Sequence, residues 1–325
     1  AVAPMPLVLF EDDHVAQLYP VTVGRAAANI GCGGFTLIEL LRAKGIEPTL
    51  TVRPHLRDVL KADGIRAAAP GDSALVGKAG DPLVLVNARM VPSVAAVDRL
   101  SQGAYREVAD GGFAAEGAKL GQYCVSETGK GPVLLDRGAS IGPYCFLRGP
   151  AYLGPGARVI EQAAIKDHVS LGHTTKIGGE IEGSVIEPYT NKQHHGFLGH
   201  SYLGSWVNLG AGTCNSDLKN TYGHVNMDYQ GRKVSTGMQF LGVMVGDYAK
   251  TAINTGIFTG KTIGSCSMVY GFVTTNVPSF VNYARSFGQV TETPVDVLTA
   301  AQARMFARRG VEQRACDVQL LHDMY

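Results

Sequence analysis

Aliphatic side chains recur every six residues through the middle of the chain. The unbroken row consists of Leu135, Ile141, Leu147, Leu153, Val159, Ile165, Leu171 and Ile177. A second row, mostly of small residues, stands two positions ahead of it, from Val133 to Thr175. A period of six fits neither an amphipathic helix nor an alternating strand, and it is typical of a parallel β-helix in which each face of a three-sided coil uses one hexad. We therefore predict that the aliphatic row fills the interior of the coil and that the second row sits at its corners.

The six-residue count is broken twice and then resumes. It continues at Phe197, Leu203 and Leu209, and again at Val245, Thr251, Ile257, Ile263 and Val269. The first break, residues 181–196, contains the run Asn-Lys-Gln-His-His, and the second, residues 214–240, is rich in polar residues. Because insertions in a solenoid form loops that often carry function, both breaks are predicted to be functional loops.

The segments that flank the repeats follow other patterns. Before them, apolar runs predict strands at 7–10, 49–53 and 83–87 and helices at 36–43, 55–62 and 94–100. This alternation predicts a mostly parallel α/β sheet, with ligands expected at the carboxyl ends of its strands. After Pro278, residues 294–309 and 311–324 have the spacing of two helices, expected to pack on the last coil or on a neighbouring subunit. The expected domains are an α/β domain at 1–115, a β-helix at 116–280 and a helical cap at 281–325.

Composition and net charge indicate which partners and which cellular compartment to expect. The net charge is +1 and 18% of the 325 residues are charged, so nucleic acid and membrane are not expected as partners. Six cysteines without metal-site spacing are expected to be reduced thiols of a cytoplasmic protein. The sequence shows neither a signal peptide nor an apolar stretch long enough to span a membrane. His168 and His173 are expected to be solvent-facing turn residues, and no metal site is predicted.

His194 and His195 are the candidate catalytic bases. Coils of this kind associate around a threefold axis, and the clefts between subunits can hold an elongated ligand. An imidazole titrates near neutral pH and can take a proton from an attacking amine or hydroxyl group. Lys192 and Lys219 are candidate phosphate contacts, with simple solvation as the alternative. Trp206 is expected to pack between subunits.

The segment from His194 to Asp217 reads HHGFLGHSYLGSWVNLGAGTCNSD. It resembles the acetyltransferase half of the bifunctional N-acetylglucosamine-1-phosphate uridyltransferase/glucosamine-1-phosphate N-acetyltransferase family, in which a catalytic His precedes a Tyr-Leu-Gly turn, an Asn-Ile-Gly-Ala-Gly-Thr coil and a Cys-Asn pair. The chain is also similar to a shorter GlmU-like group of sugar nucleotidyltransferases. With that group it shares Leu-Phe-Glu-Asp-Asp at 9–13, Asn-Lys-Gln-His-His-Gly-Phe-Leu-Gly at 191–199, Asn-Ser-Asp-Leu-Lys-Asn at 215–220 and Gly-Ile-Phe-Thr-Gly at 256–260.

The resemblance implies roles for single residues. His194 matches the general base, and Phe197 stands where the family has a substrate-contacting Tyr. Asn208 and Asn215 match sugar-binding positions, and Ala211 matches a residue whose backbone meets acetyl-CoA. The expected acceptor-binding residues are Lys192, Phe197, Asn208, Asn215 and Lys219. The pantetheine arm of acetyl-CoA is expected along the coil edge at Ala211, Asn254, Thr255 and Gly271.

The amino-terminal segment departs from the family pattern. A uridyltransferase needs a Gly-rich loop with a basic residue for the triphosphate, and here only Arg25 and Asp12 stand out as candidate nucleotide contacts. The segment is also about half the expected size, which predicts a reduced or repurposed nucleotidyltransferase fold. Mg²⁺ is expected only if this domain is an active nucleotidyltransferase. The family's Lys pair upstream of the catalytic His is missing, which leaves the acceptor open.

Together these patterns predict a homotrimeric left-handed β-helix protein that transfers an acyl group, acetyl in the first instance, from CoA to the amine of an amino sugar or amino-sugar phosphate. His194 would be the base, and a backbone N–H near Ala211 would hold the oxyanion. Two alternatives remain open. In one, the amino-terminal domain is a sugar-1-phosphate nucleotidyltransferase and the coil only trimerises it. In the other, the protein is a non-catalytic sugar-binding scaffold.

Overall fold

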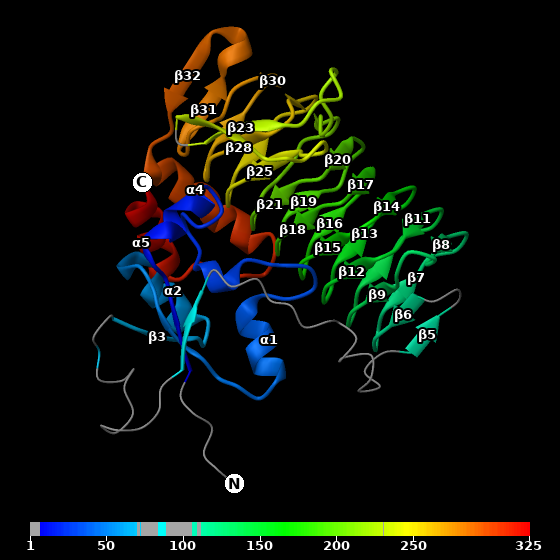
Figure 1. The fold of residues 1–325 in the computed structure, drawn as a ribbon, viewed down its shortest axis with the longest axis horizontal. Coiled ribbons are helices and arrows are strands. Elements are labelled where there is room, and N and C mark those ends of the chain that lie inside the picture. Colours follow the sequence, from blue (N-terminus) through cyan, green and yellow to red (C-terminus); the bar gives the residue numbers. More distant parts are fainter. Residues whose placement is uncertain (1–6, 70–71, 73–83, 89–105, 109–111, 230) are drawn as a thin grey trace. The chain divides into compact units, whose positions relative to one another are not determined.

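The computed structural model describes residues 7–69, 72, 84–88, 106–108, 112–229 and 231–325. The chain divides into two compact units (Figure 1), one made of residues 1–93 and 293–325 and the other of residues 94–292. This division differs from the expected domains, because the carboxyl-terminal segment joins the amino-terminal unit.

The first unit contains a four-stranded sheet in which every neighbouring pair is parallel. Its strand order is β3 (Arg66–Ala68), β2 (Thr49–Thr51), β1 (Leu7–Phe10) and β4 (Val84–Asn87). Helix α1 (Leu37–Ala43) begins at a capping box formed by Thr36 and Glu39, and α2 (Arg57–Ala62) follows β2. The predicted strands and the first two predicted helices are thus confirmed. The helix predicted at 94–100 lies outside the described residues.

The two terminal helices are confirmed as α4 (Val295–Ala307) and α5 (Ala315–Met324). Leu320 of α5 is buried in the same hydrophobic core as Leu9 and Leu50. Arg314 forms a 2.8 Å ion pair with Asp63 just after α2. Helix α5 therefore packs in the α/β unit, where its apolar face completes the core, whereas we expected the terminal helices on the last coil or on a neighbouring subunit.

The second unit is a parallel β-helix with three faces, each a ladder of short strands. The first face carries β7 (Lys119–Leu120), β10 (Ser140–Ile141), β13 (Arg158–Val159), β16 (Lys176–Ile177) and β19 (Asn191–Lys192), and farther along β26 (Lys250–Thr251), β29 (Met268–Val269), β31 (Val281–Ala284) and antiparallel β32 (Gln289–Glu292). The second carries β8 (Val125–Glu127), β11 (Phe146–Arg148), β14 (Ala164–Lys166), β17 (Glu180–Glu182) and β20 (Phe197–Gly199), then β22 (Cys214–Asn215), β27 (Gly256–Ile257) and β30 (Phe272–Val273).

The third face is the longest ladder. It begins with β5 (Arg106–Val108) antiparallel to β6 (Gly112–Ala114) and continues in parallel through β9 (Val133–Leu135), β12 (Ala151–Leu153), β15 (Val169–Leu171), β18 (Val185–Ile186), β21 (Tyr202–Leu203), β25 (Val243–Val245) and β28 (Lys261–Ile263). All eight members of the predicted aliphatic row are at most 3% exposed, and they form one core along the axis. The parallel β-helix read from the hexads is therefore confirmed.

The first predicted loop is an ordinary stretch of coil. Residues 181–196 form regular rungs in β17, β18 and β19. Ile181 follows Ile177 after four residues and Ile186 follows after five more, and both are buried. Since these corners are shorter, a strict count by six slips here, and Leu198 fills the interior where we expected Phe197. The predicted insertion at 181–196 is thus wrong.

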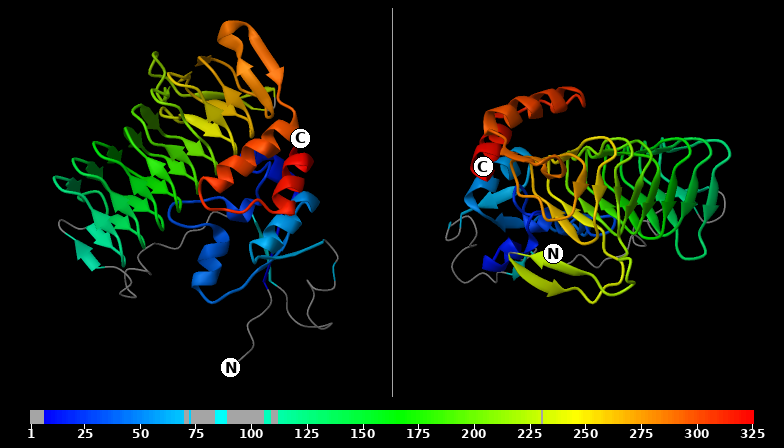
Figure 2. Two further views of the ribbon diagram at one scale, coloured as in Figure 1. Left: turned by 180° about the vertical axis from the view of Figure 1, so that it is seen from behind. Right: turned by 90° about the horizontal axis from the view of Figure 1, so that it is seen from above.

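The second predicted loop is a true insertion. The chain leaves the coil after β22 and forms an antiparallel hairpin of β23 (Asn226–Tyr229) and β24 (Arg232–Ser235). It rejoins the third face at β25. Figure 2 shows this hairpin projecting beside the coil, where it walls part of the second face.

Candidate active site

The corner between the first and second faces brings the predicted catalytic and CoA residues onto one edge. The Gly212 N–H donates to the carbonyl of His195 at 3.1 Å, and the Asn254 N–H donates to the carbonyl of Ala211 at 2.7 Å. One turn farther on, the Gly256 N–H donates to the carbonyl of Gly271 at 3.1 Å. Successive turns therefore stack His194, Ala211, Asn254 and Gly271 along a single corner, which we call the histidine edge.

Tight backbone turns form this edge. Gly196 and Gly212 have φ values of 133° and 74°, a region that L side chains rarely adopt. A Cβ atom on Gly196 would also collide with the carbonyl oxygen of Thr213 in the next turn. Because these two positions carry no side chain, the backbone of Thr213 approaches Gly196 closely and the side chain of Asn254 approaches Gly212. The side chains of His194 and His195 project outward and are exposed.

Thr255 differs from the other predicted CoA residues. Its side chain is fully buried, and its hydroxyl donates to the carbonyl of Ala252 at 2.9 Å. Its own carbonyl accepts the N–H of Cys214 at 3.0 Å. Thr255 therefore shapes the corner from inside, while its neighbour Asn254 is exposed on the edge.

Two predicted acceptor residues lie on the outside of the coil near this edge. Phe197 is half-buried, and its ring lies over Gly199, whose missing side chain leaves the space. The Phe197 N–H points at the Sγ atom of Cys214 at 3.3 Å. Asn208 is exposed on the first face, where its side-chain oxygen accepts from Nδ2 of Asn191 at 2.7 Å.

Two other predicted acceptor residues occupy interior positions. Lys192 pairs with Ile177 in the ladder and is 2% exposed, and Asn215 pairs with Ile257 and is 4% exposed. The Asn215 amide accepts the N–H of Gly199 at 2.9 Å and donates to its carbonyl at 3.0 Å. The polar groups of both side chains are thus directed at the backbone of the coil, which a motif alignment does not reveal.

A cavity of about 860 Å³ opens between the second face and the inserted segment. Its lining includes Lys219, Lys233 and Lys261 against a single carboxylate, Asp228. The exposed rings of Phe258 and Phe272 supply apolar walls. Cys214 and Asn215 are among its lining residues, and Cys214 contacts Phe197 of the preceding turn, so the cavity adjoins Phe197. Its chemistry suits a ligand that combines a flat or ring-shaped body with negative charge.

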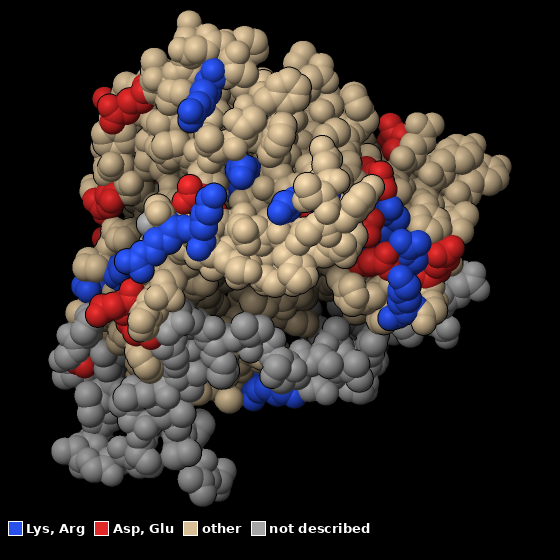
Figure 3. All heavy atoms as spheres, turned by 45° about the horizontal axis from the view of Figure 1, so that its top comes forward, with Lys and Arg blue, Asp and Glu red and all other residues tan. Residues whose placement is uncertain are grey.

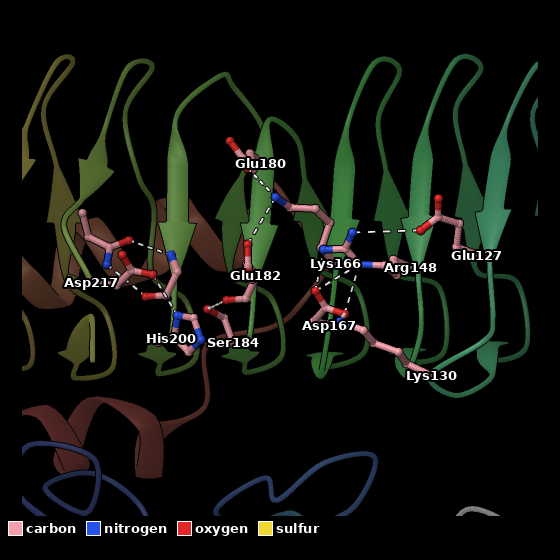
Figure 4. Close-up of polar contacts among 12 residues, drawn as sticks. Glu127, Lys130, Arg148, Lys166, Asp167, Glu180, Glu182, Ser184, His200 and Asp217 are labelled. Atoms are coloured by element: carbon pink, nitrogen blue, oxygen red, sulfur yellow. Dashed lines mark hydrogen bonds and ion pairs between the residues drawn. The ribbon is translucent and has the colours of Figure 1, made fainter. Parts of the chain in front are cut away.

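Sequence reasoning missed a histidine–carboxylate pair at the base of the insertion. Nδ1 of His200 lies 2.8 Å from Oδ2 of Asp217 (Figure 4). The imidazole also packs against the Phe240 ring, with centroids 5.2 Å apart. His200 belongs to the coil, Asp217 starts the insertion and Phe240 ends it. The three side chains therefore fasten both ends of the segment that walls the cavity. The spacing of 17 residues between His200 and Asp217, about one coil turn, is the signal that would have found the pair.

The same face carries a ladder of ion pairs farther from the histidine edge (Figure 4). Lys166 lies 3.2 Å from Glu182, and Arg148 makes a two-pronged contact with Asp167. Hydrogen bonding from the Arg148 guanidinium lowers the pKa of the Asp167 carboxyl below its ordinary value. These pairs join neighbouring turns of the coil, and they are partly exposed, so we assign them a structural role.

The predicted nucleotide contacts lie at the carboxyl end of β1. Asp12 caps a short 3₁₀ helix by accepting the N–H of His14 at 3.1 Å. Beside it, the Glu11 carboxylate accepts the N–H of Ala27 and pairs with Arg53 at 3.1 Å, and Arg53 donates to the carbonyl of Arg25 at 2.8 Å. Glu11 and Arg53 thus hold the loop that carries Arg25, and sequence reasoning did not single out Arg53.

The surface charge, the helices and the metal-binding side chains each add one observation. On the face shown in Figure 3, acidic and basic side chains lie in small groups on a largely uncharged surface. Within the described residues, no helix is long and apolar enough to cross a membrane. The same part of the chain holds no group of three or more His, Cys, Asp or Glu side chains placed to bind a metal ion.

Comparison with known proteins finds one matching family model and several sequence relatives of this chain. Residues 7–112 match the family model described as sugar nucleotidyl transferase. The bifunctional sugar-1-phosphate nucleotidylyltransferase/acetyltransferase of Sulfurisphaera tokodaii is 30% identical over 143 residues, which are 43% of this chain and 36% of that protein. The bifunctional protein GlmU of Methanococcus vannielii is 30% identical over 119 residues, 37% of this chain and 28% of that protein. That of Methanococcus aeolicus is 31% identical over 153 residues, 46% and 36% respectively.

The matched part spans about a third of the length of these relatives. Among solved structures, the UDP-N-acetylglucosamine acyltransferase of Francisella novicida is 17% identical with a TM-score of 0.37, over 63% of this chain and 71% of that one. The family resemblance read from the motifs is nevertheless confirmed by the sequence relatives. The chain is thus similar to GlmU-like proteins: residues 7–112 match the sugar nucleotidyl transferase model, and a parallel β-helix follows.

Proposed function

We propose that this protein transfers an acyl group, acetyl in the first instance, from CoA to the amine of an amino sugar or amino-sugar phosphate. In the reaction, the imidazole of His194 takes a proton from the acceptor amine as the nitrogen attacks the thioester carbonyl carbon. The tetrahedral intermediate then collapses, the C–S bond breaks and the imidazolium returns the proton to the CoA thiolate. A backbone N–H near Ala211 would stabilise the oxyanion.

The observation that carries this proposal is the histidine edge. His194, the predicted base, and Ala211, Asn254 and Gly271, predicted to meet CoA, come from residues 77 positions apart in the sequence and stack on successive turns. An extended pantetheine arm needs a straight, narrow track that leads to the base. The edge offers such a track, because its turns are stacked in line by backbone hydrogen bonds and His194 and Asn254 are exposed on it.

The cavity on the second face supports the acceptor part of the proposal. Three lysines against one aspartate favour an anionic ligand, so a phosphorylated amino sugar is the preferred acceptor. Phe258 and Phe272 offer rings on which a sugar can stack. Of the predicted acceptor residues, Lys219 and Asn215 line this cavity, and Nζ of Lys219 donates to the carbonyl of His224 at 3.1 Å.

A homotrimer is part of the proposal. Large apolar side chains stand exposed along the same corner of the coil, with Tyr123 and Tyr144 stacked at 5.0 Å in the early turns and Ile253 and Tyr270 in the late turns. Exposed apolar side chains that line one corner are suited to contact with a second coil. A neighbouring subunit would cover the histidine edge and complete a CoA groove.

The direct test is release of CoA from acetyl-CoA in the presence of a panel of amino sugars, free and phosphorylated. We expect turnover with at least one phosphorylated amino sugar and loss of that turnover in His194→Ala. Absence of release with every acceptor, together with no thermal shift at millimolar acetyl-CoA, would favour the non-catalytic scaffold.

A second candidate function is favoured by one observation. Residues 7–112 match the sugar nucleotidyl transferase model, and Glu11, Arg53 and the loop with Arg25 meet at the carboxyl end of a parallel strand, where such sheets bind ligands. A nucleotidyltransferase would release pyrophosphate from a nucleoside triphosphate and a sugar 1-phosphate in the presence of Mg²⁺. Pyrophosphate release that persists in His194→Ala and disappears in Arg25→Ala would establish this activity.

A further inference from the structure

A lysine side chain occupies the interior of the coil directly beneath the histidine edge. Lys192 pairs with Ile177, and both positions belong to the row that is aliphatic in earlier turns. With 2% of its surface exposed, Lys192 is among the largest fully buried side chains in the described part of the chain. Burial of a charge in such a row is costly, so an aliphatic residue is the default there.

The Lys192 ammonium is held by the backbone of two successive corners. Nζ donates to the carbonyl of His194 at 2.7 Å and to the carbonyl of Gly178, one turn earlier, at 2.9 Å. Gly179 makes this position available, since a Cβ atom there would lie 2.9 Å from Nζ. The side chain thus ties the turn that carries His194 to the turn below it, from the inside.

The surroundings of the Lys192 ammonium explain why its pKa departs from the ordinary value of a lysine. Burial lowers the pKa of Lys192 to about 8, while the nearby thiol of Cys214 acts in the opposite direction. The imidazoles of His194 and His195 belong to the same corner but project outward. Either protonation state retains N–H groups that can donate to the two carbonyls. A hydrocarbon side chain of the same length would leave both carbonyls without this donor.

We propose that Lys192 is a positioning residue that fixes the backbone of His194 from inside the coil, and that it does not contact the acceptor. The proposal rests on the proposed role of His194 as the base. A general base works only within hydrogen-bond reach of the proton that it takes, and small displacements of a catalytic group are expensive in rate. Lys192 therefore acts on the chemical step and leaves binding of CoA along the edge largely unaffected.

The test compares Lys192→Met with Lys250→Met in the full-length protein. Lys250 is the matched control, because burial also lowers its pKa to about 8 and its ammonium donates to the carbonyl of Tyr248 at 2.9 Å, away from the His194 turn. We expect Lys192→Met to lower kcat by about 10- to 100-fold with the KM for acetyl-CoA changed by less than about threefold. Lys250→Met is expected to stay near wild-type kcat. The kcat of Lys192→Gln, which retains an amide donor, is expected to lie between those of the two Met variants. Lys192→Gln replaces Lys192→Met in the test if the Met variant does not fold.

Hydrogen–deuterium exchange supplies a readout that does not depend on activity. We expect faster amide exchange at residues 193–197 in Lys192→Met and unchanged exchange at 250–254, in the same edge. Wild-type kcat in Lys192→Met, or a loss of kcat that Lys250→Met shares, would overturn the proposal. If the wild-type protein acylates no amino sugar, the proposed function fails, and the exchange at 193–197 alone decides whether Lys192 fixes this turn.

Discussion

Replacing Lys192 by Met should change how the stability of the protein depends on pH. The pKa of Lys192 falls from 10.5 to about 8 because its ammonium is buried. Between these values the unfolded chain binds a proton that the folded chain has released, so folding stability rises with pH in this window. A residue without an ionisable group contributes no such slope.

The size of the effect follows from the width of that window. About 2.5 pH units at about 1.4 kcal/mol each correspond to about 3.5 kcal/mol, of which about 3 kcal/mol is reached by pH 10.5 because half of the unfolded chains still hold the proton there. The free energy of unfolding of the wild type, minus that of Lys192→Met, should therefore increase by about 3 kcal/mol between pH 7 and pH 10.5. Groups that do not interact with Lys192 are present in both proteins and cancel in the difference, and the coupling to the Cys214 thiol opposes the effect of burial.

Equilibrium urea unfolding at one fixed protein concentration measures this difference. Ile177→Met is the control, because it changes the packing of the preceding interior position without removing a titratable group. Its stability difference from the wild type should stay constant with pH. If the wild type and Lys192→Met gave parallel curves from pH 7 to pH 10.5, the ammonium would be solvated and the interior placement of Lys192 would be refuted.

Four further outcomes are expected. His195→Ala should lower turnover far less than His194→Ala in the CoA-release assay, and the reverse order would move the base by one residue. Leu320→Ala should lower the free energy of unfolding of the α/β unit by about 2–5 kcal/mol in urea titrations, through the cavity that it leaves; an unchanged midpoint would contradict the placement of α5. Residues 94–292 alone should form a trimer with measurable acyl transfer, since the histidine edge lies within them; a folded trimer without turnover would show that the site needs the other unit. Phe240→Ala should raise the KM for the acceptor more than that for acetyl-CoA, because it loosens the wall of the cavity; equal effects on both would contradict this.

Local periodicity predicted the coil well where the rungs are uniform. From Leu135 to Ile177 each interior residue is an aliphatic at constant spacing, and every one of them is buried. The prediction failed at Ile181 and Ile186, where shorter corners change the spacing without changing the residue type. A strict count by six therefore predicts a loop at this point, although β17 and β18 pair with β20 and β21 and continue the parallel ladders of the coil.

The sequence predicted part of the candidate site, because residues about one coil turn apart in the sequence lie close together in a β-helix. Motif order along the chain placed His194 and Ala211 near each other, because about one coil turn separates them. The inward direction of Lys192 and Asn215 was not predictable, since a charged or amide side chain is not expected in an aliphatic row and only the register with Ile177 and Ile257 reveals it. The packing of α5 depends on contacts with residues far away in the sequence, such as Leu9, and left no local signal.

The rate of CoA release from acetyl-CoA with a phosphorylated amino sugar, compared between the wild type and His194→Ala, tests the proposed reaction most directly. We expect turnover by the wild type and a loss of about 100-fold or more in kcat in the variant, with acetyl-CoA binding retained, since removal of a general base typically costs that much in the chemical step. Wild-type turnover in His194→Ala would contradict the assignment of the base and with it the catalytic role of the histidine edge.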